Sequence, residues 1–278
     1  REAMEATLLT KALDQAQAWH AEGRPLTVSI NLSGRQLGDP ALKRRLGDAL
    51  AARPRLDPAA LQVEVLESSA VQLTATLLEN MRWLASRRIA LAIDDFGTGY
   101  ASLSLLQALP VTTVKIDRTF VQALTTDVRQ AVIVHSVLGM ARGLMRQVVA
   151  EGIESVEIGA RLIQLGCRLG QGFVIARPMP AQALPAWLRR WQRPAAWRAA
   201  RPVAGAQVPG LLMRWDHAAW RERVLQRLAA PSPASLGDAN PQCLLGGWLS
   251  GLGRELGPQA LRRSHAELHA LAAELLQH

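Results

Sequence analysis

Six short apolar runs before residue 180 each end in polar side chains that could do chemistry. These side chains are Asn31, Glu64, Asp94 with Asp95, Lys115 with Asp117, Glu151 and Gln171. Clustered carboxylates repel one another unless cations neutralise them, and oxygen ligands without histidine or cysteine suit Mg²⁺ or Mn²⁺ better than Zn²⁺. Two such ions roughly 3.5–4 Å apart, bridged by a carboxylate and a water, would prepare a hydroxide to attack a phosphodiester. The residues therefore predict a metal-dependent phosphoryl hydrolase.

The runs that carry these residues have the pattern of buried parallel strands. They cover residues 26–31, 61–65, 89–94, 112–117 and 147–152, with a weaker run at 166–173. Most are continuously apolar, as strands covered on both faces are, and helical patterns such as 75–88 and 130–145 lie between them. Alternating strands and helices predict an α/β barrel, in which the carboxyl ends of the strands meet at one face.

Each of these residues also has a simpler interpretation. Polar residues are common where strands emerge into solvent, and the Asp94–Asp95 pair could be a turn or a helix cap. Asn31 could cap the helix that follows it, and Lys115 could be a partly buried partner in a salt bridge. The prediction of a metal site depends on the agreement of six strand ends.

The composition limits the function classes. With 278 residues, of which 49% are hydrophobic, the chain is long enough for one large and one small domain and is not globally disordered. The net charge of +9 would suit an anionic partner, but the cations are mostly scattered arginines. One tyrosine and three phenylalanines offer few stacking residues, so we expect no nucleic-acid polymer as partner.

The cysteines and the start of the chain bear on its location. Only Cys167 and Cys243 are present, which argues against a disulfide scaffold and fits a reducing compartment. The sequence contains no apolar run of membrane-spanning length and no secretory signal, so we expect a cytoplasmic protein. Because Arg1 stands within a helix-like pattern, we expect a fragment of a longer protein, which could itself be membrane-anchored.

Five motifs resemble the EAL domain in their order and spacing. They are "INLSGRQL", "VEVLES", "AIDDFGTGYASLSLLQALPVTTVKIDRTFV", "VVAEGIES" and "LGCRLGQGFVIARPMP", and the resemblance covers roughly residues 1–192. That family comprises bacterial cyclic di-GMP phosphodiesterases with a modified (β/α)₈ barrel. The resemblance implies hydrolysis of cyclic di-GMP to linear pGpG with two Mg²⁺ or Mn²⁺ ions. The alternative is a catalytically inactive receptor for cyclic di-GMP.

The resemblance also implies roles for individual residues. The metal ligands would be Asn31, Glu64, Asp94, Asp95 and Glu151, with Asp94 bridging the ions. Lys115 would orient the attacking water and Gln171 would support the site. The segment 95–103, which includes Asp95, Phe96, Gly97, Thr98 and Gly99, resembles a loop that couples metal binding, substrate binding and dimerisation. Glu67 would anchor that loop, and a homodimer is implied.

Two features depart from the family pattern. The Glu-Ala-Leu tripeptide, which in the family lies on the first barrel strand and supplies a metal-ligating glutamate, is absent from the sequence. We therefore expect a barrel that lacks its first strand, and the chain alone could be inactive. Leu66 stands where the family usually has threonine, next to the loop anchor.

The sequence after the barrel motifs changes character. Residues 193–210 are rich in arginine, proline and alanine and predict a linker, whereas 211–278 reads as an all-helical second domain. Its His217, His265 and His269 with Cys243 make a sufficient tetrahedral zinc set, and the last two histidines share one face of a helix. Alternatively, these histidines are a polar stripe and the cysteine is a small buried residue.

Three motifs of this second domain resemble the chemoreceptor zinc-binding (CZB) domain. They are "HAAW", "CLLGGWL" and "HAELH". The resemblance implies a four-helix bundle over residues 211–278, with Zn²⁺ bound by His217, Cys243, His265 and His269. Trp220 and Trp248 would be core residues of the bundle. It also implies a module that senses zinc or oxidants and modulates the phosphodiesterase.

Overall fold

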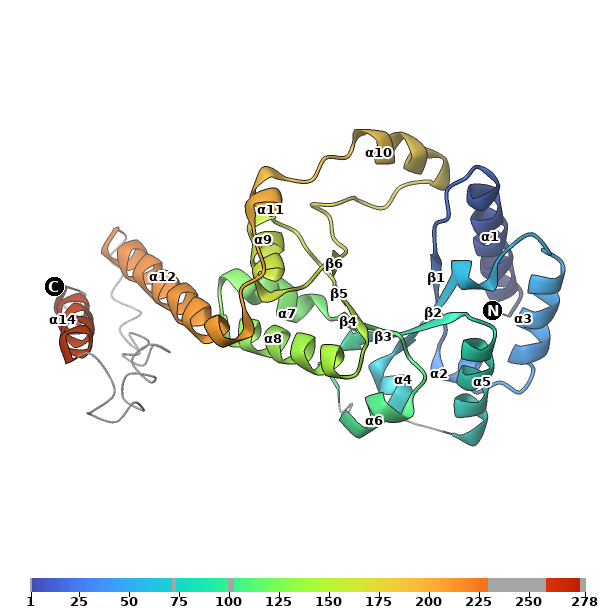
Figure 1. Cartoon of the computed structure of the whole chain (residues 1–278), viewed down its shortest axis with the longest axis horizontal. Helices are drawn as coiled ribbons and strands as arrows, with labels where there is room; N and C mark the ends of the chain where they lie inside the picture. The colour runs from blue at the N-terminus through green and yellow to red at the C-terminus, as the bar shows by residue number, and fades with distance from the viewer. Residues whose placement is uncertain (1, 72–73, 100–102, 230–258, 276–278) are drawn as a thin grey trace.

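The computed structural model describes residues 2–71, 74–99, 103–229 and 259–275. Six strands form one parallel sheet in sequential order (Figure 1). The strands are β1 (Val28–Asn31), β2 (Leu61–Leu66), β3 (Ala90–Phe96), β4 (Thr113–Ile116), β5 (Gln147–Ala150) and β6 (Leu169–Gly170). All six strands predicted from apolar runs are therefore present, and each pairs in parallel with its neighbour in the sequence.

Helices connect the strands and cover the outer side of the sheet (Figure 1). Before β4 they are α1 (Glu2–Ala21), α2 (Gly34–Leu37), α3 (Leu42–Ala51), α4 (Glu67–Val71), α5 (Ala75–Ser86) and α6 (Leu103–Ala108), with a short 3₁₀ turn η1 (Pro58–Ala60). After β4 they are α7 (Arg118–Gln122), η2 (Ala123–Thr125), α8 (Val128–Gly143) and α9 (Val156–Leu165). After β6 follow η3 (Ala181–Ala183), α10 (Leu184–Arg190), α11 (Ala195–Ala199), η4 (Gly205–Gln207), α12 (Val208–Ala229) and α14 (Gln259–Leu275).

The sheet of the described residues is an open half-barrel. It has β1 at one edge and β6 at the other, so it is not a closed eight-stranded barrel. The central strands are apolar on both faces because both faces are covered: Val63, Leu91, Ile93 and Val114 have no exposed surface. The α/β class with helical crossovers is confirmed.

Side-chain caps explain where the crossover helices begin. The predicted helix 75–88 is α5, and the Thr74 hydroxyl accepts a hydrogen bond from the Leu77 amide at 3.2 Å. The predicted helix 130–145 is α8, which begins two residues earlier because the Asp127 carboxylate accepts from the Arg129 amide. β6 is shorter than the run that predicted it, since α9 extends as far as a left-handed glycine C-cap at residue 166.

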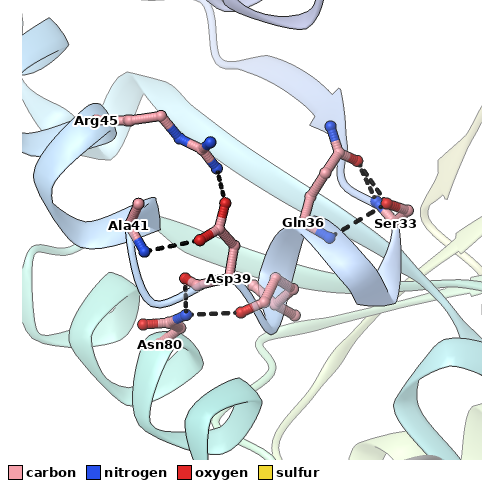
Figure 2. Close-up of polar contacts among 7 residues, drawn as sticks. Ser33, Gln36, Asp39, Ala41, Arg45 and Asn80 are labelled. Carbon is pink, nitrogen blue, oxygen red and sulfur yellow. Dashed lines mark hydrogen bonds and ion pairs between the residues drawn. The ribbon is translucent and has the colours of Figure 1, made fainter. Parts of the chain in front are cut away.

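A polar network fixes the chain just after β1 (Figure 2). Ser33 is the N-cap of α2 in a capping box with Gln36, so the alternative that Asn31 caps this helix is wrong. The Asp39 carboxylate accepts from the Ala41 amide at 2.8 Å and pairs with Arg45. Buried Asn80 on α5 donates to the main-chain carbonyls of Leu37 and Asp39 at 2.7 and 2.9 Å. The turn that follows Asn31 is thereby tied to the core.

The C-terminal helices extend away from the sheet on the α8 side (Figure 1). The 193–210 segment contains α11, η4 and the first residues of α12. α12 and α14 are the described helices of the predicted bundle, and Cys243 and Trp248 lie outside the described residues. Within the described part of the chain, none of the helices is long and apolar enough to cross a membrane.

Candidate active site

A β-bulge at the end of β3 brings two adjacent carboxylates to one place. In the ladder between β3 and β4, Ile93 pairs with Val114 but Phe96 pairs with Ile116, so β3 carries one extra residue there. Asp95 within the bulge has a left-handed backbone with φ of 54°. Neighbouring residues of a regular strand point to opposite faces, and the bulge removes that alternation.

A cluster of three carboxylates lies at the carboxyl ends of β3 and β5. One ligand oxygen from each of Asp94, Asp95 and Glu151 lies within 4.8 Å of the other two. Glu151 follows β5 directly, and its amide donates to the Ile116 carbonyl at 3.1 Å, which fixes its height along the sheet. This is the edge at which the sequence predicted a metal site.

Lys115 on β4 is the cation at the centre of this group. Its Nζ lies 2.6 Å from Glu64 Oε2, 2.9 Å from Asp94 Oδ1 and 2.6 Å from Glu151 Oε1. Only 5% of its surface is exposed. Burial by itself would lower the pKa of Lys115, but the hydrogen bonds that its ammonium donates to Glu151, Glu64 and Asp94 outweigh burial and raise it. Lys115 is therefore also a buried salt-bridge partner, as the simpler interpretation of the sequence had it.

Like charges and burial perturb the carboxylates themselves. Burial raises the pKa of Glu151, although its hydrogen bond to Lys115 acts in the opposite direction. Burial and the neighbouring charge of Asp94 raise the pKa of Asp95, which hydrogen-bonds to Asp117. Burial would raise the pKa of Asp117, but hydrogen bonds from the Thr119 hydroxyl and amide lower it on balance. The contact between these two carboxyls therefore raises the pKa of Asp95 and lowers that of Asp117.

Asp117 is the site neighbour for which sequence reasoning gave no role. It is buried, and its carboxylate caps α7 by accepting from the Thr119 amide at 2.8 Å. The sequence signal that could have assigned Asp117 to the site was its position directly after β4, among the polar residues at strand ends. Asp117 therefore caps α7 and also contacts the site through its hydrogen bond with Asp95.

The glycine-rich loop after β3 is held by one glutamate. Glu67 is 2% exposed, and its Oε2 accepts from the Gly97 amide at 2.7 Å and from the Gly99 amide at 3.3 Å. The backbone of Gly97 has a φ of 102°, a conformation that residues other than glycine rarely adopt. The Thr98 hydroxyl donates to the Asp95 carbonyl at 2.9 Å, closing the turn. Residues 100–102 of the predicted loop lie outside the described residues.

The remaining predicted residues lie around the same edge. Asn31 ends β1 in register with Glu64, and the Gln171 amide donates to the Ala150 carbonyl at 2.8 Å. Both side chains are exposed, and among the described residues neither has a hydrogen bond to the cluster. Phe96 is instead buried in the apolar core. The structure thus unites Glu64, Asp94, Asp95, Lys115 and Glu151 by contact, and it places Asn31 and Gln171 beside them by main-chain register.

A second cluster lies between α12 and α14. One ligand nitrogen from each of His217, His265 and His269 lies within 4.8 Å of the other two. His217 Nδ1 and His269 Nε2 are buried and have no hydrogen-bond partner within the described parts of the chain. Burial lowers the pKa of His265 and of His269, and the neighbouring imidazoles act in the same direction. Trp220 stacks on His269 with ring centroids 3.9 Å apart.

Comparisons with known proteins match the barrel part of the chain. The model of the EAL domain matches residues 2–178. The chain is 40% identical over 160 residues to the cyclic di-GMP phosphodiesterase RocR of Pseudomonas aeruginosa, covering 58% of this chain and 41% of RocR. It is 37% identical over 178 residues to the bifunctional diguanylate cyclase/cyclic di-GMP phosphodiesterase MucR of the same organism, covering 64% of this chain and 26% of MucR. The chain therefore spans less than half the length of these relatives.

Solved structures agree with the fold. The c-di-GMP complex of the PaMucR phosphodiesterase aligns with a TM-score of 0.63 at 36% identity, over 66% of this chain and 74% of that one. The calcium/cy-diGMP complex of Klebsiella pneumoniae BlrP1 aligns with a TM-score of 0.56 at 31% identity, over 62% of this chain and 43% of that one. The open parallel sheet, its carboxylate-lined edge and these matches lead to one conclusion: the chain belongs to the EAL domain family.

Proposed function

We propose that this chain hydrolyses cyclic di-GMP to linear pGpG at the carboxylate cluster, with two divalent cations. The observation that carries the proposal is the convergence of Asp94, Asp95 and Glu151 within 4.8 Å at the carboxyl edge of the sheet. With Glu64 joined to them through Lys115, four carboxylates face one ammonium, a formal charge of −3 when all are ionised. Two dications, with a total charge of +4, more than offset that excess and prefer oxygen ligands.

The residues fit hard cations by their chemistry. All of the candidate ligand atoms are oxygens, and the related BlrP1 structure is a complex with calcium and cyclic di-GMP. When bound, the ions supply positive charge at the phosphate and lower the pKa of a coordinated water. Mg²⁺ or Mn²⁺ is the proposed resident metal.

The chain's own residues then position the reactants. Lys115 is the ammonium donor of the cluster, so it can donate a hydrogen bond to the attacking water or to a phosphate oxygen. Glu67 holds the loop of Gly97 and Gly99 beside this edge. In the reaction the water oxygen bonds to phosphorus, one P–O3′ bond breaks, and the freed 3′ oxygen takes up a proton. One water is consumed for each pGpG formed.

Turnover by site variants tests this proposal. We expect Mn²⁺- or Mg²⁺-dependent conversion of cyclic di-GMP to pGpG, measured by chromatography, and a loss of about 10²-fold or more in Asp94→Asn and Glu151→Gln. Glu79→Gln is a matched control, since Glu79 is an exposed partner of Lys43. Unchanged rates in the two site variants would overturn the assignment. Tight binding of cyclic di-GMP by the wild-type protein without product would support the receptor alternative.

We further propose that residues 211–278 form a zinc-binding module that modulates the phosphodiesterase. Two of the three clustered histidines present buried nitrogens that have no hydrogen-bond partner among the residues that the structure describes, and the lowered pKa of His265 and His269 favours the neutral imidazole that binds metal. Cys243 is the proposed fourth ligand, by resemblance to the CZB domain. A bound zinc would supply a Lewis acid that holds the cysteine as thiolate and keeps the two helices together.

Metal analysis of purified protein tests the zinc module. We expect one zinc per chain in the wild type and in His20→Gln, whose histidine lies far from the cluster in the sequence and contacts the Leu26 carbonyl. His269→Ala and Cys243→Ala should lose stoichiometric zinc. Zinc retained at one ion per chain in both variants would refute the proposed coordination.

A further inference from the structure

The segment 195–215 packs against α9 through α11 and against α8 through the start of α12, and we call it the brace. Its first buried side chain is Trp197, which is 6% exposed and donates from its indole Nε1 to the Val156 carbonyl at 2.7 Å. The Trp197 ring occupies the space that a side chain at Gly159 would need. Only glycine at that position allows such close packing, and Figure 1 shows α11 beside α9. The brace therefore engages the first turn of α9 by both a hydrogen bond and ring packing.

The brace also holds the rest of α9. The Val203 amide donates to the Gln164 carbonyl near the end of that helix at 2.9 Å. The Arg161 guanidinium lies 4.8 Å from the centroid of the Trp215 ring and donates to the Leu124 carbonyl at 2.8 Å. Contacts are thus distributed from the first residue of α9 to its last turn.

The final part of the brace is the start of the helix that carries the histidine cluster. Val208, Leu211 and Leu212 at the beginning of α12 are buried in the same apolar core as α8 and α9. Trp215 follows on the same helix, and His217 lies two residues beyond it. Leu212 and His217 are five positions apart on one continuous α-helix, a rise of about 7.5 Å. Core and metal cluster therefore share one rigid element.

α9 in turn lies between two strand ends of the carboxylate site. It follows Glu151 by a loop of four residues that ends at its N-cap Ser155, and it precedes Gln171. Ile153 within that loop is buried, and its amide donates to the Gln171 carbonyl at 3.0 Å. This short loop is the direct main-chain connection between Glu151 and α9.

We infer that the brace couples metal occupancy of the histidine cluster to the carboxylate site, through α12 and α9. This inference rests on the zinc module proposed above. Metal bound at His217 fixes the distal half of α12, and the continuous helix transmits that order to the brace contacts on α9. Because coupling between sites is reciprocal, cyclic di-GMP changes zinc affinity by the same factor as zinc changes cyclic di-GMP affinity.

Hydrogen exchange of α9 amides with and without Zn²⁺ tests the coupling in the full chain. One variant carries two glycines inserted between Trp215 and Asp216, which interrupts α12 between brace and cluster. The matched control carries the same two glycines after Glu222, beyond His217, so the linking part of α12 stays continuous. A third variant, Trp215→Leu, keeps the helix and removes the ring under Arg161.

We expect zinc to slow exchange of α9 amides by roughly 5–150-fold in the wild type and in the control, the range of ordinary coupling energies. The effect should vanish in the variant with the interrupted helix and shrink in Trp215→Leu, while all four proteins bind one zinc. Zinc binding without any change of α9 exchange in the wild type would overturn the coupling and leave the zinc module intact. No zinc uptake by the wild type would instead refute the zinc module, and the coupling with it.

Discussion

Replacing Lys115 by methionine tests the electrostatics of the candidate site. Methionine keeps a comparable unbranched side chain but removes the ammonium that Glu64, Asp94 and Glu151 contact at 2.6–2.9 Å. The carboxylates would then repel one another in a place where little water can screen them, because Lys115 is 5% exposed. We expect the variant to be strongly destabilised without divalent cations and partly rescued by them.

The magnitude follows from the burial of the pairs. Removing one partner of a buried ion pair costs about 3–5 kcal/mol. For a domain of this size the loss corresponds to a fall in Tm of roughly 6–20 °C. A cation present at 100 times its Kd restores about 2.7 kcal/mol, because it binds the folded cluster and not the unfolded chain. The variant should also bind Mg²⁺ more tightly than the wild type, since Lys115 no longer competes for the same oxygens.

Urea unfolding with and without Mg²⁺ measures both effects. Lys43→Met is the control, because Lys43 forms an exposed pair with Glu79, and such pairs contribute about 0–1 kcal/mol. Turnover of cyclic di-GMP by Lys115→Met should fall by about 10²-fold or more even when Mg²⁺ restores stability. If metal-free Lys115→Met were no less stable than Lys43→Met, or if Mg²⁺ gave no rescue, the reasoning would be refuted.

Three further predictions concern the loop and the core. Glu67→Gln should keep the fold but speed amide exchange at Gly97 and lower turnover, because a carboxylate accepting two amides is lost; unchanged exchange would contradict this role. Gly97→Ala should destabilise the protein by about 1–2 kcal/mol, since φ at Gly97 is 102° and the new Cβ would lie 2.9 Å from the Phe120 ring. Gly139→Ala, in open space on α8, should instead stabilise the protein slightly. Thermal unfolding of both variants measures these changes, and equal Tm values for the two would contradict the prediction. Cys167 should resist alkylation at pH 8 in the folded protein, because burial raises the pKa of its thiol to about 11; rapid labelling located by mass spectrometry would show otherwise.

Much of the fold could be predicted because its signal is local. Continuous apolar runs mark strands covered on both faces, and all six runs became strands in a single parallel sheet. The carboxyl ends of parallel strands meet at one edge, so Glu64, Lys115 and Glu151 could be assigned to one site from their place near the carboxyl end of each run. In the structure, Lys115 contacts both Glu64 and Glu151.

The β3 bulge could not be predicted from the sequence. Two adjacent aspartates after an apolar run suit a turn, a cap or a site equally well, and a regular strand would send them to opposite faces. Their convergence depends on one extra residue in the β3–β4 ladder and on the left-handed backbone of Asp95, which are tertiary outcomes. Asp117 was likewise visible as a strand-end residue, but its contact with Asp95 is a tertiary contact that no local pattern marks.

The brace escaped sequence reasoning for a different reason. Arginine, proline and alanine dominate residues 193–210, and this composition is typical of a linker. The buried Trp197 in that range is one residue among many small and charged ones, and its partner is a glycine in the middle of α9. A contact made by one tryptophan and one glycine leaves no periodic pattern for the sequence to display.

Counting Mn²⁺ ions at the carboxylate cluster tests the central claim most directly. Electron paramagnetic resonance of the protein with Mn²⁺ and cyclic di-GMP reports both the stoichiometry and the coupling of the ions. We predict two magnetically coupled ions per chain, roughly 3.5–4 Å apart, and loss of the coupled signal in Asp94→Asn. A spectrum of isolated ions that Asp94→Asn leaves unchanged would contradict a two-metal site at this edge of the sheet.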